Sequence, residues 1–301
     1  MGGISKCVNL KSAEVKLCSY LVNGESQYGV MTDTGIIDLS KRIGGDYPTL
    51  VTLIKAQAIE IARDAAAMQP SDFGFDSVKF LPLTAEPVKI FCVGVNYKDH
   101  RAETGRTEEQ FPSAFAKFRE SLVGHNEVLV RPKGLVSMDF EVEYAAVIGR
   151  KARNIGIGDA MNYVAGYTIL NDGTIRDYQY ERGIFQGKNF WHTGACGPCM
   201  VTRDMAPDWK NTFLETRLNG VVMQSATVDQ LIMGVPFLVS YFSRQTLLKP
   251  GDIIATGTPA GVGHRRLPPV YLKPGDLLEM EITGIGVLRN TVVDESEVIP
   301  C

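Results

Sequence analysis

The most constraining stretch of this sequence is residues 139–150, where three carboxylates alternate with apolar side chains. Asp139, Glu141 and Glu143 are spaced two residues apart, so in a β-strand all three would point to the same face. Both faces are then apolar through residues 145–148, which is typical of a strand buried on both sides. Because buried carboxylates without partners are strongly unfavourable, we expect the acidic end to bind a cation in an interior or cleft. The alternative is the solvated face of an edge strand.

The composition of the chain excludes several classes of protein. Of its 301 residues 45% are hydrophobic and 22% are charged, which is typical of a globular protein of one or two domains. A net charge of −3 without a Lys/Arg stripe argues against nucleic acid as a partner. The sequence has no apolar run of about 18 residues, and its start is too polar for a signal peptide. We therefore expect no membrane association, a cytoplasmic location and reduced thiols for its six cysteines.

The first part of the chain predicts a small N-terminal α/β module over residues 1–85. Asn23-Gly24 stands between two strand-like runs and predicts a β-hairpin. Residues 47–68 carry the apolar spacing of a helix, with a proline near its start. Residues 69–87 are rich in Pro, Asp, Ser and Thr, which is typical of a linker.

The remaining residues, 86–301, predict a β-rich α+β domain. Asn219-Gly220 is a second hairpin signal, and residues 229–247 have the periodicity of a helix. The segment Leu-Lys-Pro-Gly-Asp occurs at 248 and again at 272, each time as a turn that leads into a strand-like run. No alternation of strands and helices is evident, so we expect a roll or barrel of antiparallel strands.

A further carboxylate, Asp172, follows the apolar stretch 163–170 in the tripeptide Asn-Asp-Gly. By itself, this tripeptide is typical of a turn. Combined with Glu141 and Glu143, Asp172 would supply a third oxygen ligand from a neighbouring strand. Two or three carboxylates with water suit Mg²⁺ or Mn²⁺, with Ca²⁺ as an alternative, whereas zinc prefers His and Cys.

His100 and Glu103 follow a predicted buried strand at residues 89–94. On one helical turn, a Glu at i+3 can orient an imidazole and stabilise its protonated form. The alternative is a pair of ordinary surface side chains. Lys188, in Gly-Lys-Asn, is by itself a candidate for a solvated lysine.

Together these motifs resemble the fumarylacetoacetate hydrolase family, in its acylpyruvate hydrolase branch. The resemblance covers most of residues 88–292, with the motifs in family order, whereas the N-terminal module matches only loosely. The matching stretches are FCVGVNYKDHRAE (91–103), DFEVEYAAVIGR (139–150), YVAGYTILNDGTIRDYQ (163–179), GKNFWHTGACGP (187–198), LNGVVMQSATVDQLIMGVP (218–236) and LKPGDIIATGTPAGVG (248–263).

The resemblance implies a fold, a metal site and a water-activating pair. The fold would be a mixed β-sheet roll or barrel. Glu141, Glu143 and Asp172 would hold the metal ion. His100 and Glu103 would activate water from a loop that orders over bound substrate.

The resemblance also implies residues that contact the substrate. Lys188 would stabilise an enolate, and Arg176, Gln179 and Thr258 would bind the substrate's carboxylate end. Two stretches depart from the family pattern: residues 173–175, which affect backbone flexibility, and residues 115–120, which could alter substrate fit.

The activity implied is hydrolysis of an acylpyruvate, such as maleylpyruvate or fumarylpyruvate, to pyruvate and a carboxylic acid in aromatic catabolism. A pyruvyl group can chelate a hard cation, which would stabilise the enolate that leaves. The alternatives are decarboxylation of an oxaloacetate-type acid and isomerisation of a 2-hydroxymuconate-type acid on the same site. The presence of both His100 and Glu103 favours hydrolysis, because only hydrolysis needs an activated water. Arg119 and the run 264–266 are candidates to bind a second carboxylate, with a solvated loop as the alternative for either, and the resemblance favours a homodimer.

Three other classes compete with this reading. Cys196-Gly197-Pro198-Cys199 resembles a thioredoxin site, but a strand-like run follows it and the setting expected of that fold is missing. A binding protein that has lost turnover would share the metal site. A protein-interaction module would use the apolar helix near residues 231–242.

Overall fold

The computed structural model describes residues 15–84, 88–105, 107 and 110–298. The expectations for the N-terminal segment, Cys7 and Cys301 therefore concern residues outside the described ranges.

The N-terminal part begins with the predicted hairpin. Strand β1 (Lys16–Val22) pairs with β2 (Glu25–Met31) through a turn in which Asn23 and Gly24 both have positive φ, 52° and 81°. This geometry matches the twist of the flanking strands and explains why Asn-Gly is favoured there. Strand β3 (Ile36–Asp38) and helix α1 (Leu39–Ile43) follow, with the Asp38 carboxylate accepting from the Lys41 backbone N–H.

The predicted single helix over 47–68 is two helices, α2 (Leu50–Ala56) and α3 (Ile59–Ala66). Gln57 adopts a left-handed conformation, with φ 58°, and its N–H closes the last turn of α2. Left-handed caps usually carry Gly or Asn, so a glutamine gave no sign of this break.

Residues 69–84 are not a free linker, which corrects the sequence-based expectation for the part of 69–87 that the structure describes. The Phe73 carbonyl accepts from the Ile36 N–H, and β4 (Lys79–Phe80) pairs with β1. Arg42 forms an ion pair of 2.6 Å with Asp72. The segment is therefore bound across the N-terminal module.

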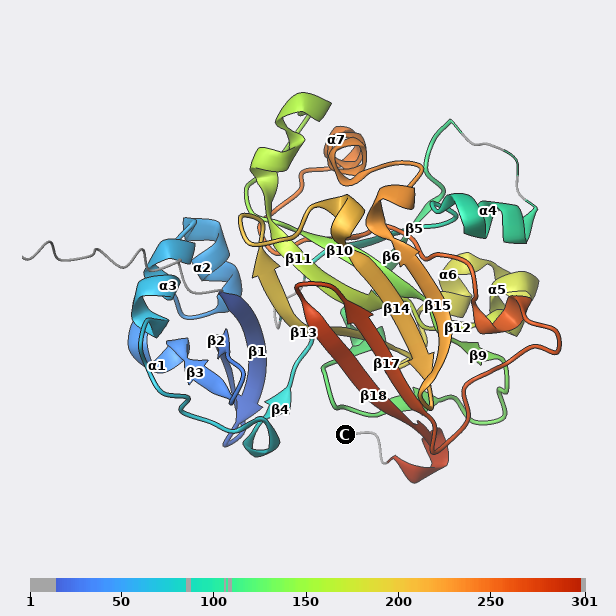
Figure 1. Ribbon diagram of the computed structural model, residues 1–301, viewed down its shortest axis with the longest axis horizontal. Coiled ribbons are helices and arrows are strands. Elements are labelled where there is room, and N and C mark those ends of the chain that lie inside the picture. The colour runs from blue at the N-terminus through green and yellow to red at the C-terminus, as the bar shows by residue number, and fades with distance from the viewer. Residues whose placement is uncertain (1–14, 85–87, 106, 108–109, 299–301) are drawn as a thin grey trace, which may run out of the picture.

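A large mixed sheet forms the framework of the molecule, in the order β3-β2-β1-β13-β11-β10-β16-β5-β6. Lys16 of β1 pairs with Val201 of β13, so the N-terminal sheet continues into the main one (Figure 1). The strands added here are β5 (Ile90–Val93), β6 (Ala114–Lys117), β10 (Val142–Ile148), β11 (Val164–Asn171), β13 (Gly194–Thr202) and β16 (Ile253–Ala255), with β7 (Leu122–Val123) paired to β13.

A second sheet, in the order β15-β14-β17-β18-β8, lies over the large one in Figure 1. Its strands are β8 (Leu129–Arg131), β14 (Phe213–Leu218), β15 (Val221–Thr227), β17 (Leu277–Ile282) and β18 (Gly286–Asp294). A two-stranded ribbon joins β9 (Met138–Asp139) to β12 (Thr174–Ile175). Three pairs, β5·β16, β7·β13 and β8·β18, are parallel, and the described residues form no closed barrel. The fold is thus α+β and rich in sheet, as predicted, and its sheets are mixed, as the resemblance implied, and not purely antiparallel, as the motifs alone suggested.

Strand β10 is buried along its whole length, as its apolar pattern predicts. Ala146 and Ile148 pack in the core between the two sheets, together with Met280 of β17. Ala145 and Val147 face the opposite core, which also contains residues of α2. The strand that leads out of the acidic stretch is therefore covered on both faces.

The described helices are all short, and the longest of them, α7 (Val235–Gln245), has 11 residues. The predicted helix over 229–247 is α7, preceded by a separate 3-10 turn, and no described helix is long and apolar enough to cross a bilayer. The remaining helices are α4 (Lys98–Thr104), α5 (Arg176–Arg182), α6 (Ile184–Lys188) and α7 (Val235–Gln245). The 3-10 turns are Phe75–Ser77, Arg119–Ser121, Ile157–Tyr163, Trp209–Asn211, Val228–Gln230, Gly263–Arg265 and Glu295–Glu297.

Candidate active site

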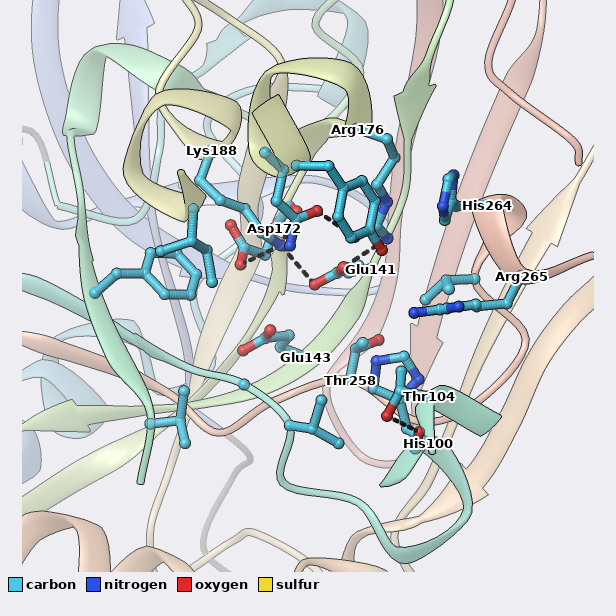
Figure 2. A pocket seen from close by; sticks show the side chains of 18 residues that line it. His100, Thr104, Glu141, Glu143, Asp172, Arg176, Lys188, Thr258, His264 and Arg265 are labelled. Carbon is cyan, nitrogen blue, oxygen red and sulfur yellow. Dashed lines mark hydrogen bonds and ion pairs between the residues drawn. The ribbon is translucent and has the colours of Figure 1, made fainter. Parts of the chain in front are cut away.

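Four strand ends meet at one edge of the large sheet. The start of β10 pairs with the end of β11, at Val142 and Asn171. The end of β16 lies between β10 and the end of β5. Because β5 and β16 are parallel, the loops that follow them leave from the same edge. These loops, with α5 and α6, line one cavity (Figure 2).

Three buried carboxylates lie together in this cavity. Glu141, Glu143 and Asp172 each offer an oxygen within 4.8 Å of the others. Their exposed fractions are 6%, 1% and 1%. The Asp172 backbone N–H donates to the Glu141 carbonyl at 2.9 Å, which fixes the two chain segments against each other. The structure thus brings together the three residues predicted as metal ligands.

Asp139 does not join this group, although its spacing suggests that it should. The chain leaves strand geometry between β9 and β10, so the alternation of faces is interrupted after Asp139. Its carboxylate accepts instead from the backbone N–H groups of Gly263 and His264 and from Arg176 Nε, at 2.8, 3.0 and 2.7 Å. Asp139 therefore holds a loop and an arginine at the edge of the cavity.

Ammonium groups partly compensate the charge of the carboxylates. Lys188 Nζ lies 2.6 Å from Glu141 Oε2 and 2.8 Å from Asp172 Oδ2. Burial alone would raise the pKa of Glu141, but Lys188 and Arg176 lower it to about 2. Burial and the charges of Asp172 and Glu141 raise the pKa of Glu143 well above its usual range. Negative charge is thus least compensated at Glu143.

The donor set fits a hard divalent cation. All of its candidate ligand atoms are carboxylate oxygens, which suit Mg²⁺, Mn²⁺ or Ca²⁺ better than zinc. Both oxygens of Asp172 are buried and ion-paired, but neither accepts a hydrogen bond of normal geometry from the described residues. Among the described residues, Glu143 accepts a hydrogen bond only from the Gly257 N–H, at 2.9 Å. Oxygens that are close together, buried and short of donors are suited to metal coordination.

Lys117 is a further residue of the site, and it was not predicted from the sequence. Its Nζ lies 2.9 Å from Asp172 Oδ1 and donates to the carbonyl groups of Gly173 and Lys188, and the side chain is fully buried. It lies in the stretch that departs from the family pattern, where we expected only altered substrate fit. Strand alternation puts Lys117 on the same face as Phe115, but only the structure shows that Phe115 lines the cavity, so the sequence pattern did not indicate this role.

His100 and Glu103 form the predicted pair on helix α4. His100 Nδ1 and Glu103 Oε2 are 2.7 Å apart, and Glu103 Oε1 accepts from the Gly261 N–H at 3.0 Å. Burial opposes ionisation of Glu103, but the His100 hydrogen bond and the Gly261 N–H lower its pKa overall. An ionised Glu103 accepts the proton on Nδ1, so Nε2 of His100 is left as the basic nitrogen. His100 faces the same cavity as Thr258 (Figure 2).

Arg176, Gln179 and Thr258 also line the cavity, as the resemblance implied. Arg176 is already neutralised, because it contacts Asp139 and Glu141 at 2.7 Å each. It also donates to Gln179 Oε1 at 2.8 Å. Arg176 therefore positions Glu141, a candidate metal ligand, in addition to any contact with a substrate.

Arg265 differs from the other cations that line the cavity. Lys188 and Arg176 are in ion pairs, whereas Arg265 makes no ion pair with any residue that the structure describes. Its side chain extends toward Thr258 and His100 in Figure 2. Arg119 and Arg266 were the other arginines expected as candidates to bind a second carboxylate. Arg119 donates a hydrogen bond to the Thr84 carbonyl, and Arg266 donates hydrogen bonds to backbone carbonyls. Arg265 is therefore the candidate that the structure retains.

The Cys-Gly-Pro-Cys segment is part of the buried strand β13. Cys196 packs in the core on one face of the sheet and Cys199 in the core on the other. Burial raises the pKa of the two thiols to about 11 and about 12. A thioredoxin-type site needs an accessible, acidic thiol, so the redox alternative does not fit this structure.

The sheet-rich α+β fold and the buried carboxylate triad agree with the enzyme family that the sequence motifs indicated. Residues 89–293 match the family model described as fumarylacetoacetate (FAA) hydrolase C-terminal. The chain belongs to the fumarylacetoacetate hydrolase family, and this confirms the resemblance.

Members with different reactions are similar to this chain. The oxaloacetate tautomerase Fahd2a of Rattus norvegicus, a mitochondrial protein, is 38% identical over 263 residues, which are 86% of this chain and 84% of the relative. The structure of fumarylacetoacetate hydrolase from Exiguobacterium antarcticum matches with a TM-score of 0.78 and 32% identity, over 93% of this chain and 100% of that one. Maleylpyruvate hydrolase from Sphingobium sp. SYK-6, in complex with manganese(II) and pyruvate, matches with a TM-score of 0.77 and 26% identity, over 93% and 99% of the two chains. The family is thus shown, whereas the reaction differs among its members.

Proposed function

We propose that this chain interconverts the keto and enol forms of a small 2-oxo dicarboxylic acid of the oxaloacetate type. The observation that carries the proposal is that one cavity is lined by the carboxylate triad, by His100, which is paired with Glu103, and by Arg265, which makes no ion pair with a described residue. The 38% identity to an oxaloacetate tautomerase supports the same reaction. Glu141, Glu143 and Asp172 would hold Mg²⁺ or Mn²⁺, and the bound metal would polarise the 2-oxo group and favour loss of the neighbouring proton.

The protein's own groups supply the proton transfer. His100 Nε2 takes a proton from the carbon next to the 2-oxo group and returns it to the oxygen, directly or through a water. Glu103, held by the Gly261 N–H, fixes the imidazole tautomer and stabilises its charged form. Lys188 places positive charge beside the triad, where it stabilises an enolate oxygen.

The second carboxylate of the substrate would meet Arg265. A dicarboxylic acid carries one carboxylate beside its 2-oxo group and another at its distal end. The first would lie at the triad, within reach of Thr258. Carboxylates of the protein already neutralise Arg176 and Lys188. The distal carboxylate of the substrate would therefore bind Arg265, which makes no ion pair with a described residue.

Hydrolysis of an acylpyruvate is the second candidate function. The same His100 nitrogen could take a proton from water, which would then attack the distal carbonyl of a 2,4-dioxo acid. The fold similarity to a maleylpyruvate hydrolase supports this candidate. The His100–Glu103 pair can take part in either reaction. The presence of both residues therefore does not by itself favour hydrolysis over tautomerisation.

Two assays on the same metal-loaded protein separate the candidates. The first follows the ultraviolet absorbance of enol oxaloacetate after dilution into buffer. The second measures pyruvate released from oxaloacetate and from a panel of 2,4-dioxo acids. Enol decay proportional to enzyme, without pyruvate, supports the tautomerase. Pyruvate with a carboxylic acid from a dioxo acid, and no effect on enol decay, would replace it with the hydrolase, and pyruvate with CO₂ from oxaloacetate would indicate a decarboxylase.

A further inference from the structure

Gln224, on strand β15, is 1% exposed and uses its whole side-chain amide in hydrogen bonds. Its Oε1 accepts from the Val142 backbone N–H at 3.1 Å and from Thr216 Oγ1 at 2.9 Å. Its Nε2 donates to Thr258 Oγ1 at 2.8 Å and to the Pro259 carbonyl at 2.9 Å. The glutamine therefore joins the second sheet to the metal-ligand strand and to the loop that carries Thr258.

The orientation of this amide is fixed by its partners. The Val142 N–H can only donate and the Pro259 carbonyl can only accept, so exchanging the amide O and N would break both bonds. Thr258 must consequently face the NH₂ group, and its oxygen acts as an acceptor in this contact.

A threonine hydroxyl has one proton to donate. The Thr258 oxygen receives the Gln224 N–H and makes no other hydrogen bond within the described part of the chain, so its own proton is left for a different acceptor. Thr258 is 4% exposed and lines the cavity beside Glu143 and His100 (Figure 2). The free proton is thus available to a ligand in that cavity.

We propose that Gln224 is a positioning residue that makes Thr258 an obligatory donor toward the cavity. The hydroxyl then selects a ligand that presents an oxygen acceptor, such as the carboxylate of a 2-oxo acid. This inference rests on the proposed function only in taking the ligand to be a 2-oxo acid or its analogue, and it holds for either reaction considered above.

Gln224 also contacts the backbone of Val142, between the ligands Glu141 and Glu143. A variant of Gln224 could therefore act through the metal site and not through Thr258. The experiment separates the two routes by measuring Mn²⁺ affinity and oxalate affinity independently, each by calorimetry on the full-length chain.

The first variant is Gln224→Glu, which keeps the shape but cannot donate when ionised. The Thr258 hydroxyl would then donate to residue 224 and turn its proton away from the cavity. We expect oxalate affinity of the Mn²⁺-loaded protein to fall about 10- to 100-fold, the range for loss of a hydrogen bond to a charged group. Mn²⁺ affinity should not fall, because no ligand oxygen is changed and the added negative charge favours a cation. In turnover, KM should rise more than kcat falls.

Two further variants make the result specific. Thr258→Val should lose oxalate affinity to the same extent, and the double variant should lose no more than either single one. Thr216→Val is the matched control, because it removes a bond to the same amide but leaves the Thr258 contact in place. It should lower the melting temperature without changing oxalate affinity.

If Gln224→Glu does not fold, Gln224→Met replaces it. Methionine leaves the Pro259 carbonyl free to accept the Thr258 proton, so oxalate affinity should again fall. The inference is overturned if Gln224 variants bind oxalate as wild type does, if Thr258→Val has no effect, or if the losses in the double variant add. A protein that binds oxalate in the expected pattern but turns over neither oxaloacetate nor a dioxo acid would contradict the proposed function alone.

Discussion

Lys117 Nζ lies 2.9 Å from Asp172 Oδ1, and the exposed fractions of the two side chains are 0% and 1%. On its other side Asp172 meets Lys188 at 2.8 Å. The carboxylate is therefore held between two ammonium groups, and Lys117 also binds the backbone that carries Lys188. Asp172 is oriented by this arrangement before any ligand arrives.

Replacing Lys117 with methionine should destabilise the metal-free protein. The change leaves the buried Asp172 with one partner fewer, and breaking a buried ion pair typically costs about 3–5 kcal/mol. A divalent metal would restore the lost positive charge, so Mn²⁺ should raise the melting temperature of Lys117→Met more than that of wild type. Urea unfolding with a chelator, and thermal unfolding with and without Mn²⁺, test both points.

The control for this variant is Lys79→Met, which removes a lysine that is 58% exposed and 3.1 Å from Glu127. Exposed pairs contribute about 0–1 kcal/mol, so its effect should be small. Equal stability of the two variants would contradict a structural role for Lys117.

Removing a bound metal should abolish activity, because in the proposed reaction the metal ion polarises the 2-oxo group of the substrate. Chelation should return enol decay to the rate without enzyme, and either Mn²⁺ or Mg²⁺ should restore the acceleration while Zn²⁺ should not. Glu143→Gln removes one candidate ligand with almost no change of shape and should weaken Mn²⁺ binding measured by calorimetry. Full activity of the chelated protein would rule out the metal site.

Arg265→Met should weaken binding of dicarboxylic substrates in particular. The guanidinium is exposed, so a carboxylate contact there is worth about 1 kcal/mol, equivalent to roughly a fivefold rise in KM for oxaloacetate. A 2-oxo acid with an uncharged distal end serves as the control substrate, and its KM should not change. A similar rise for both substrates would mean that Arg265 supports the loop and does not read the second carboxylate.

His100→Gln and Glu103→Gln should reduce kcat and leave ligand binding in place. General acid–base groups contribute about 10²- to 10⁴-fold, so a loss in that range is expected for His100 and a smaller one for Glu103. Glu120→Gln makes the same change at an exposed carboxylate and should have no effect. Oxalate affinity in the presence of Mn²⁺ should persist in all three, and its loss would show that the dyad acts on binding.

His125 should make stability depend on pH. Its Nδ1 accepts from the Arg289 N–H at 3.2 Å, and burial together with Arg289 lowers its pKa to about 4. A histidine whose folded pKa is below its unfolded value favours the folded state above about pH 6.5, and this contribution is lost as the pH falls toward 4. The stability advantage of wild type over His125→Gln should therefore shrink by about 2 kcal/mol between about pH 7 and pH 4.5. Parallel urea titrations at the two pH values measure it, and a constant difference would refute the assignment.

The sequence predicted the features that depend on local chemistry. Asn-Gly turns gave the hairpins at Asn23 and Asn219, and the double-sided apolar pattern gave β10. Glu141, Glu143 and Asp172 were recognisable because carboxylates next to buried strands need a cation or other positive partner. Their roles, like those of His100 and Glu103, await the experiments above.

Features that depend on long-range contacts were not predictable. Asp139 continues the acidic alternation but lies before a break in the strand, and its partners are 37 and 124 residues away. Gln224 looks like any polar strand residue, because its partners at Val142 and Thr258 come from two other segments. The contacts of Lys117 and of the segment around β4 were not predicted for the same reason. A sequence pattern does not reveal which distant segments of the chain meet.

The position of β16 between β10 and β5 has a consequence for how the chain folds. Residues 253–255 fill this place, although both neighbouring strands are made more than 100 residues earlier. During synthesis one edge of β10 stays unpaired until β16 is made, and such an edge favours association with other chains. The active site and the protection of that edge are completed together, late in synthesis, so conditions that stall translation before β16 should favour aggregation of the nascent protein.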